Sequence, residues 1–61
     1  MGQVYFEFRR IGSSMRVAAV DAATGVEVQV VGPANASQRD LERLALAKLK
    51  LRLEREKSGI R

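Results

Sequence analysis

The side chains that most often carry out chemistry are missing from this chain. Its 61 residues include no histidine and no cysteine, which removes the commonest general base, the soft metal ligands and every Ser-His or Cys-His nucleophile. The serines are explained by predicted turns and helix ends, and they are Ser13, Ser14, Ser37 and Ser58. We therefore expect no enzyme, no bound metal and no cofactor.

The acidic residues do not form a convincing catalytic pair either. Asp40 and Glu42 are two positions apart in a predicted helix and project about 200° from one another. Glu7 and Glu27 belong to predicted strands on either side of a middle strand that carries Arg16, so we expect them to neutralise that cation. The glycines stand singly and form no phosphate-binding loop. No small-molecule substrate is evident.

The basic residues are the charged group with a clear spatial pattern. Residues 37–61 contain eight basic and four acidic residues, which accounts for the whole formal net charge of +4. Four of the basic residues fall along one side of the predicted helix, with Glu54 interrupting them: Arg39, Arg43, Lys50 and Lys57. Phosphates could lie along this row, so nucleic acid is a possible partner, although no aromatic residue accompanies it. The alternative is an ordinary solvated helix face.

Two predicted hairpins precede this helix. Residues 3–11 alternate between apolar and polar side chains, which is typical of a half-buried strand. Gly12-Ser13 then fits a two-residue type II′ turn, which places Phe8 opposite Val17 and Phe6 opposite Ala19. Residues 21–26 fit a four-residue loop with Gly25 in the left-handed conformation, which pairs Ala19 with Val28 and Val17 with Val30. Together the turns place nine apolar residues on one face: Val4, Phe6, Phe8, Met15, Val17, Ala19, Val26, Val28 and Val30.

The helix is predicted over residues 38–57. Gly32-Pro33 ends the third strand, and Ser37 with Asp40 forms an imperfect capping box. Ser58-Gly59 stops the helix. Such a helix is about 30 Å long and a seven-residue strand about 23 Å, so its last turn or two should overhang the sheet.

The leucines of this helix cover more of its circumference than one sheet can bury. Seven apolar residues spread over about 220°, and Leu51 points away from Leu49 and Leu53. We expect the surplus to form a partner surface of Leu46, Leu49 and Leu53, most simply in a homodimer. Shelter by the aliphatic stems of lysine and arginine is the alternative. The outer sheet face, which bears Tyr5 and Val20, is a second possible interface.

These elements predict one α+β domain over residues 1–61. It is a three-stranded antiparallel meander sheet with one C-terminal helix packed on one face, in the order β-β-β-α. No apolar run is long enough to span a membrane, and no signal peptide is evident. With no cysteine to form a disulfide, a cytoplasmic location is expected.

The chain resembles a known family at three short segments. They are residues 5–12 (YFEFRRIG), Thr24-Gly25 and Val31-Gly32-Pro33. Through these segments the chain resembles a family of short, uncharacterised alphaproteobacterial proteins, which is a domain of unknown function. The similarity covers nearly the whole chain. The resemblance implies a bacterial cytosolic source and no catalytic activity.

We conclude from the sequence that binding is the function to expect. The first hypothesis is a small protein-protein interaction module that forms a homodimer or docks on a larger protein. The second is nucleic-acid binding through the basic row of the helix.

Overall fold

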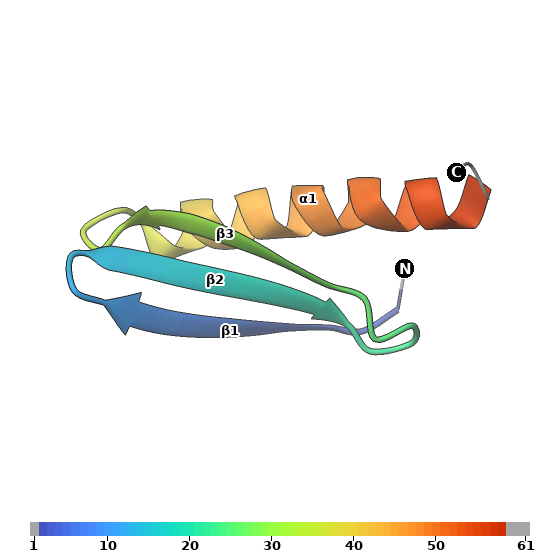
Figure 1. The fold of residues 1–61 in the computed structure, drawn as a ribbon, viewed down its shortest axis with the longest axis horizontal. Coiled ribbons are helices and arrows are strands. Elements are labelled where there is room, and N and C mark those ends of the chain that lie inside the picture. Colours follow the sequence, from blue (N-terminus) through green and yellow to red (C-terminus); the bar gives the residue numbers. More distant parts are fainter. Residues whose placement is uncertain (1, 59–61) are drawn as a thin grey trace.

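The computed structural model of the protein describes residues 2–58, and the side chains of residues 2–56. Three strands are followed by one helix: β1 (Val4–Ile11), β2 (Ser14–Asp21), β3 (Glu27–Pro33) and α1 (Gln38–Ser58). The strands form one antiparallel sheet in the order β1-β2-β3, and α1 packs on one side of it (Figure 1). The predicted β-β-β-α fold is confirmed. The helix stop predicted at Gly59 lies outside the described residues.

The first hairpin turns as predicted. Gly12 has a φ of 59°, and Ser13 is not among the residues with positive φ, which is the combination that a type II′ turn requires. Phe8 is paired with Val17, and both predicted strand registers are confirmed. The Arg10 Nε donates a hydrogen bond of 3.1 Å to the Gly12 carbonyl, which ties the end of β1 to the turn.

The second hairpin depends on one glycine and one aspartate. Gly25 has a φ of 78°, and the Asp21 amide donates to the Val26 carbonyl at 2.9 Å. The Asp21 carboxylate, 3% exposed, accepts hydrogen bonds at its Oδ2 from the Thr24 amide at 3.2 Å and from the Thr24 hydroxyl at 2.7 Å. The turn geometry was predicted, but the role of Asp21 as its internal support was not.

The N-terminus of α1 is capped by Ser37. Its Oγ accepts a hydrogen bond of 3.3 Å from the Asp40 amide, and its carbonyl accepts one of 3.1 Å from the Leu41 amide. A serine in this position satisfies one of the amides that a helix start leaves without a partner. The predicted cap is confirmed.

The core lies between α1 and the two strands nearest to it. The helix contributes residues spaced four apart, and the buried cluster is Met15, Val17, Ala19, Val28, Leu41, Ala45 and Leu49. Gly32 lets the helix come close to β3, since a Cβ at this position would lie 2.6 Å from Leu41 Cδ2. The absence of a side chain at Gly32 therefore leaves room for the end of the Leu41 side chain.

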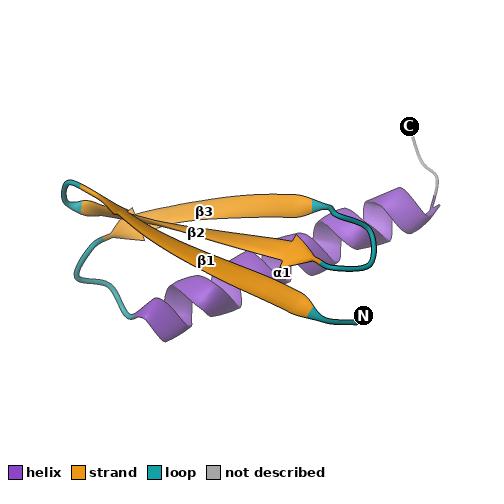
Figure 2. Cartoon of the chain, turned by 90° about the horizontal axis from the view of Figure 1, so that it is seen from below, coloured by secondary structure: helices purple, strands orange, loops and turns teal. Residues whose placement is uncertain are grey.

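The nine apolar residues share one face as predicted, but α1 does not bury them all. The helix makes its contacts with β2 and β3, and it crosses the strands obliquely (Figure 2). Phe8 in β1 is 37% exposed, while Val4 and Phe6 are only partly buried. The last turns of α1 extend beyond the strands, as expected (Figure 1). The apolar side of β1 is therefore only partly covered, and Phe8 is its exposed residue.

The orientation of α1 can be tested with two leucines that lie two positions apart. Leu49 is 0% exposed and Leu51 is 52% exposed. We expect Leu49→Ala to lower the free energy of unfolding by about 2–5 kcal/mol, because it opens a cavity in the core. Leu51→Ala should lower it by less than about 1 kcal/mol. Urea unfolding followed by circular dichroism measures both, and equal losses would mean that α1 presents a different side to the sheet.

The second hairpin can be tested through Gly25. Alanine in the left-handed conformation that Gly25 adopts is strained, so Gly25→Ala should cost about 1–2 kcal/mol of stability. Gly2→Ala is the matched control, because Gly2 has no positive φ and a methyl group there would have no atom within 4 Å. Thermal unfolding of the two variants should differ by several degrees. Identical melting temperatures would contradict the described turn.

Candidate interaction surface

The predicted leucine surface is partly wrong, because the sheet uses one of its members. Leu49 is 0% exposed and belongs to the core, so it cannot contact a partner. Leu53 packs partly against the core, and Leu46 is half-buried. The exposed leucines are instead Leu44 and Leu51, at 59% and 52%. The side of α1 centred on Ala45 therefore faces the sheet. The apolar residues at the two edges of this side are only partly covered.

A strip of apolar surface lies between β1 and α1. Lys48 indicates which side of α1 lies near β3, since its Nζ donates to the Gln29 carbonyl at 2.8 Å. Leu46 and Leu53 lie about 140–160° around the helix from Lys48 and so face the β1 side. On the strand itself, the half-buried Phe6 and the exposed Phe8 point to the same face. Phe8 is the exposed member of this set, while Phe6 and Leu53 also pack partly against the core. We call Phe6, Phe8, Leu46 and Leu53 the uncovered strip.

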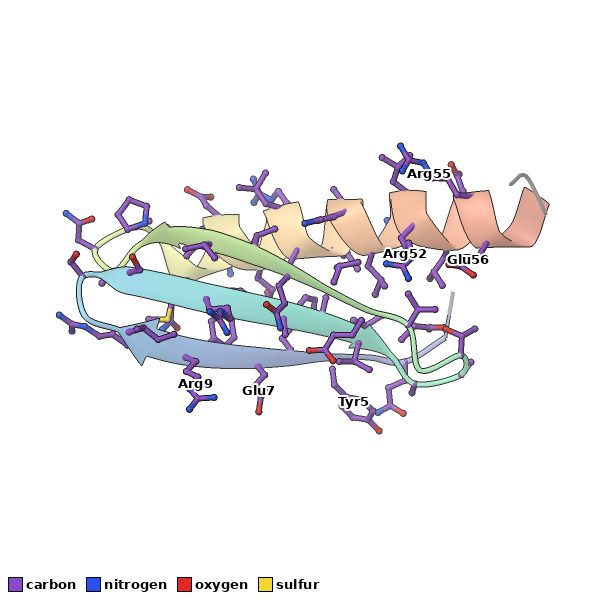
Figure 3. The ribbon with its side chains drawn as sticks, in the orientation of Figure 1. Tyr5, Glu7, Arg9, Arg52, Arg55 and Glu56 are labelled. Carbon is purple, nitrogen blue, oxygen red and sulfur yellow. The ribbon has the colours of Figure 1, made fainter. Side chains whose placement is uncertain are left out.

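The outer face of the sheet carries charges that do not neutralise one another as predicted. Arg16 in the middle strand makes no ion pair with Glu7 or Glu27 among the residues that the structure describes. Its direct partner in β1 is Arg9, so two cations stand side by side. Glu7 and Arg9 both point away from the sheet along β1 (Figure 3). These two side chains are therefore charged, exposed and without an ion-pair partner within residues 2–56.

The same outer face also exposes apolar side chains at the ends of β1. Tyr5 is 55% exposed and Ile11 is 48% exposed, and both alternate with the charges along the strand. Val31 in β3 is 64% exposed. A face with this much apolar surface beside isolated charges is suited to contact with another protein.

Three members of the predicted basic row lie on the solvent side of α1. Arg39, Arg43 and Lys50 are exposed, and no ion pair engages them within the described part of the chain. Lys57, the fourth, lies outside the residues whose side chains are described. Elsewhere on the helix, Arg52 pairs with Glu56, with 3.0 Å between Nε and Oε2 (Figure 3). Three of the four predicted members are therefore exposed to solvent.

An open groove of about 820 Å³ runs between the second hairpin loop and the C-terminal half of α1. Asp21, Lys50 and Glu54 contribute polar side chains to its walls, and Leu53 contributes an apolar one. The Asp21 Oδ1 is buried and has no hydrogen-bond partner among the described residues. Within the same residues, no group of three or more acidic side chains is arranged to hold a metal ion. No described helix is both long and apolar enough to cross a bilayer.

The residues on β1 were not singled out from the sequence as a site. Phe6 and Phe8 were assigned to the core, and Glu7 was assigned to Arg16. The signal that could have identified them is a Glu-Phe-Arg triplet in a predicted edge strand, which is self-complementary when the strand meets an antiparallel copy of itself. The sequence could not show that the helix would leave this strand uncovered.

Comparison with known proteins gives a family. The sequence model of one family, described as Domain of unknown function (DUF6898), matches residues 1–56. No curated protein and no solved structure matches the chain. The family match agrees with the resemblance to an uncharacterised domain, and it carries no assignment of substrate, partner or activity.

Proposed function

Because the chain belongs to the DUF6898 family, a domain of unknown function, we propose a function from its own geometry. It is a small, non-catalytic protein-protein interaction module that self-associates as a homodimer. The observation that carries the proposal is the uncovered strip, in which Phe8 remains 37% exposed on the face that the sheet otherwise uses for its core. A second copy is the simplest molecule that can cover it.

The small size of the core supports a second copy as the occupant. Among the residues that the structure describes, the buried apolar cluster contains seven residues. Small domains commonly gain the stability they lack by associating.

The other parts of the proposal rest on the sequence. A chain without histidine or cysteine lacks the side chains of the commonest catalytic sites, which supports a non-catalytic role. The family resemblance at residues 5–12 supports a bacterial cytoplasmic setting.

Nucleic-acid binding is the second candidate, and one observation favours it. Arg39, Arg43 and Lys50 are exposed on one side of α1 without an ion-pair partner in the described residues. A complex held by phosphates would weaken steeply between low and moderate salt. A homodimer held mainly by apolar contacts would change much less over the same range. A titration with duplex DNA and with RNA at two salt concentrations therefore separates the two candidates.

The homodimer is tested by sedimentation equilibrium at micromolar concentrations. We expect a mass near twice that of one chain. Phe8→Ser should weaken the dimer by at least about tenfold, because it removes the most exposed member of the strip. The matched control is Leu51→Ser. Leu51 is also an exposed apolar residue, but it lies on α1 and is not part of the uncovered strip.

Two results would contradict the proposal. A folded monomer at every accessible concentration would exclude self-association. Equal weakening by Phe8→Ser and Leu51→Ser, with circular dichroism spectra unchanged, would exclude the uncovered strip as the interface.

A further inference from the structure

We propose that β1 pairs edge to edge with β1 of a second copy, antiparallel, with the two-fold axis at Phe8, so that the dimer contains one continuous six-stranded sheet. The inference rests on the proposed self-association and specifies its geometry. It is carried by three independent features of β1: an open edge, an exposed aromatic side chain at the centre of the strand, and a charge pattern that complements itself.

The two edges of the sheet differ in how accessible they are. On β3, the outward carbonyl of Gln29 is bound by Lys48 Nζ at 2.8 Å, and Pro33 ends the strand with a residue that has no amide hydrogen. Lysine and proline are the residues that proteins use to block edge pairing. On the other side of the sheet, β1 forms the edge farthest from α1 (Figure 1). The β1 edge is therefore the more open of the two edges among the described strands.

The backbone of β1 presents its outward groups at known positions. In a two-residue hairpin the pair that closes the turn is hydrogen-bonded, so Ile11 and every second residue before it bond to β2. The 3.0 Å bond from the Ala22 amide to the Gln3 carbonyl continues this alternation. The amides and carbonyls of Phe6, Phe8 and Arg10 therefore point outward and are available to a second strand.

The charges of β1 select the register. With the axis at Phe8, Glu7 lies opposite the partner's Arg9, and Arg9 lies opposite the partner's Glu7. Each charge that lacks an ion-pair partner within the described chain then meets one of opposite sign. The pairing also supplies an anion to Arg9, which otherwise stands beside Arg16.

The neighbouring registers place like charges together. An axis at Glu7 would put two Glu7 side chains opposite one another, and an axis at Arg9 would do the same with two arginines. A register whose axis falls between two residues would place an inward-facing side chain opposite an outward-facing one. The pleat of the sheet does not allow this pairing. The axis at Phe8 is therefore the one that the charges favour.

The apolar side chains fit the same register. On the inner face, Phe8 meets Phe8 of the partner subunit, in the part of the sheet that α1 leaves uncovered. On the outer face, Tyr5 meets the partner's Ile11, and both of these residues are about half exposed in the single chain. Aromatic and β-branched pairs of this kind are favourable across antiparallel strands.

A charge-reversal set tests the register. We expect Glu7→Arg and Arg9→Glu each to weaken the homodimer by at least about tenfold, since each creates two like-charge contacts. Mixing the two variants should form a heterodimer, because one chain then carries only arginines and the other only glutamates at positions 7 and 9. The chain with both substitutions should form a homodimer again, with its net charge unchanged. Glu27→Arg, on the same face of β3, is the control and should leave the dimer intact.

A cysteine cross-link tests the axis directly, because the natural chain contains no cysteine. Paired residues at the axis have Cα atoms about 5.5 Å apart, within the range that a disulfide spans. Loss of the Phe8 ring weakens the dimer, so the protein concentration is raised in proportion, and Phe8→Cys should then form a cross-linked dimer on mild oxidation. Tyr5→Cys is the control, since the two copies of residue 5 would be about 20 Å apart.

The outcomes separate this inference from the proposed function. A wild-type dimer that is unaffected by Glu7→Arg and Arg9→Glu, and that does not cross-link through residue 8, would overturn the edge pairing and leave self-association standing. A wild-type chain that remains monomeric would overturn both.

Discussion

The arrangement of this protein depends on one geometric constraint, which is that a single helix cannot cover three strands. A helix is about 10 Å wide and neighbouring strands are about 4.8 Å apart, so one helix buries roughly two of them. Here Gly32 allows Leu41 to approach β3 closely, and Lys48 binds the Gln29 carbonyl at the β3 edge. Both contacts lie on the β3 side of α1. The apolar side of β1 is only partly covered, and Phe8 remains exposed.

The parts of the fold that depend on neighbouring residues could be predicted from the sequence. Gly12 and Gly25 fix the two turns because each adopts a positive φ, and the turns in turn fix the strand registers. Ser37 could be identified as the helix cap because capping is a local interaction. Alternation along the strands then determined which side chains share a face, although not how many of them would be buried.

The parts that depend on contacts distant in the sequence could not be predicted. The broad apolar arc of α1 allows several orientations with similar apolar burial. The orientation observed places Ala45 in the core and Leu41 against Gly32, which has no side chain. This is why Leu49 was predicted on a partner surface but lies in the core. The expected neutralisation of Glu7 by Arg16 failed for a different reason, because the register predicted from the first turn already pairs Glu7 with Ala18 and Arg16 with Arg9. The charges along β1 indicate a pairing pattern only if β1 is an accessible edge of the sheet.

The central claim is that β1 is an interaction edge, and amide hydrogen exchange at the Phe8 backbone tests it most directly. Within one chain this amide points away from β2 and has no hydrogen-bond partner in the sheet, whereas the amides of Glu7 and Arg9 bond to β2. We expect the Phe8 amide to become protected as the concentration rises through the dimerisation range, while the Glu7 and Arg9 amides are protected throughout. Exchange of the Phe8 amide at the rate of an unstructured chain, at concentrations where the protein sediments as a dimer, would contradict the account.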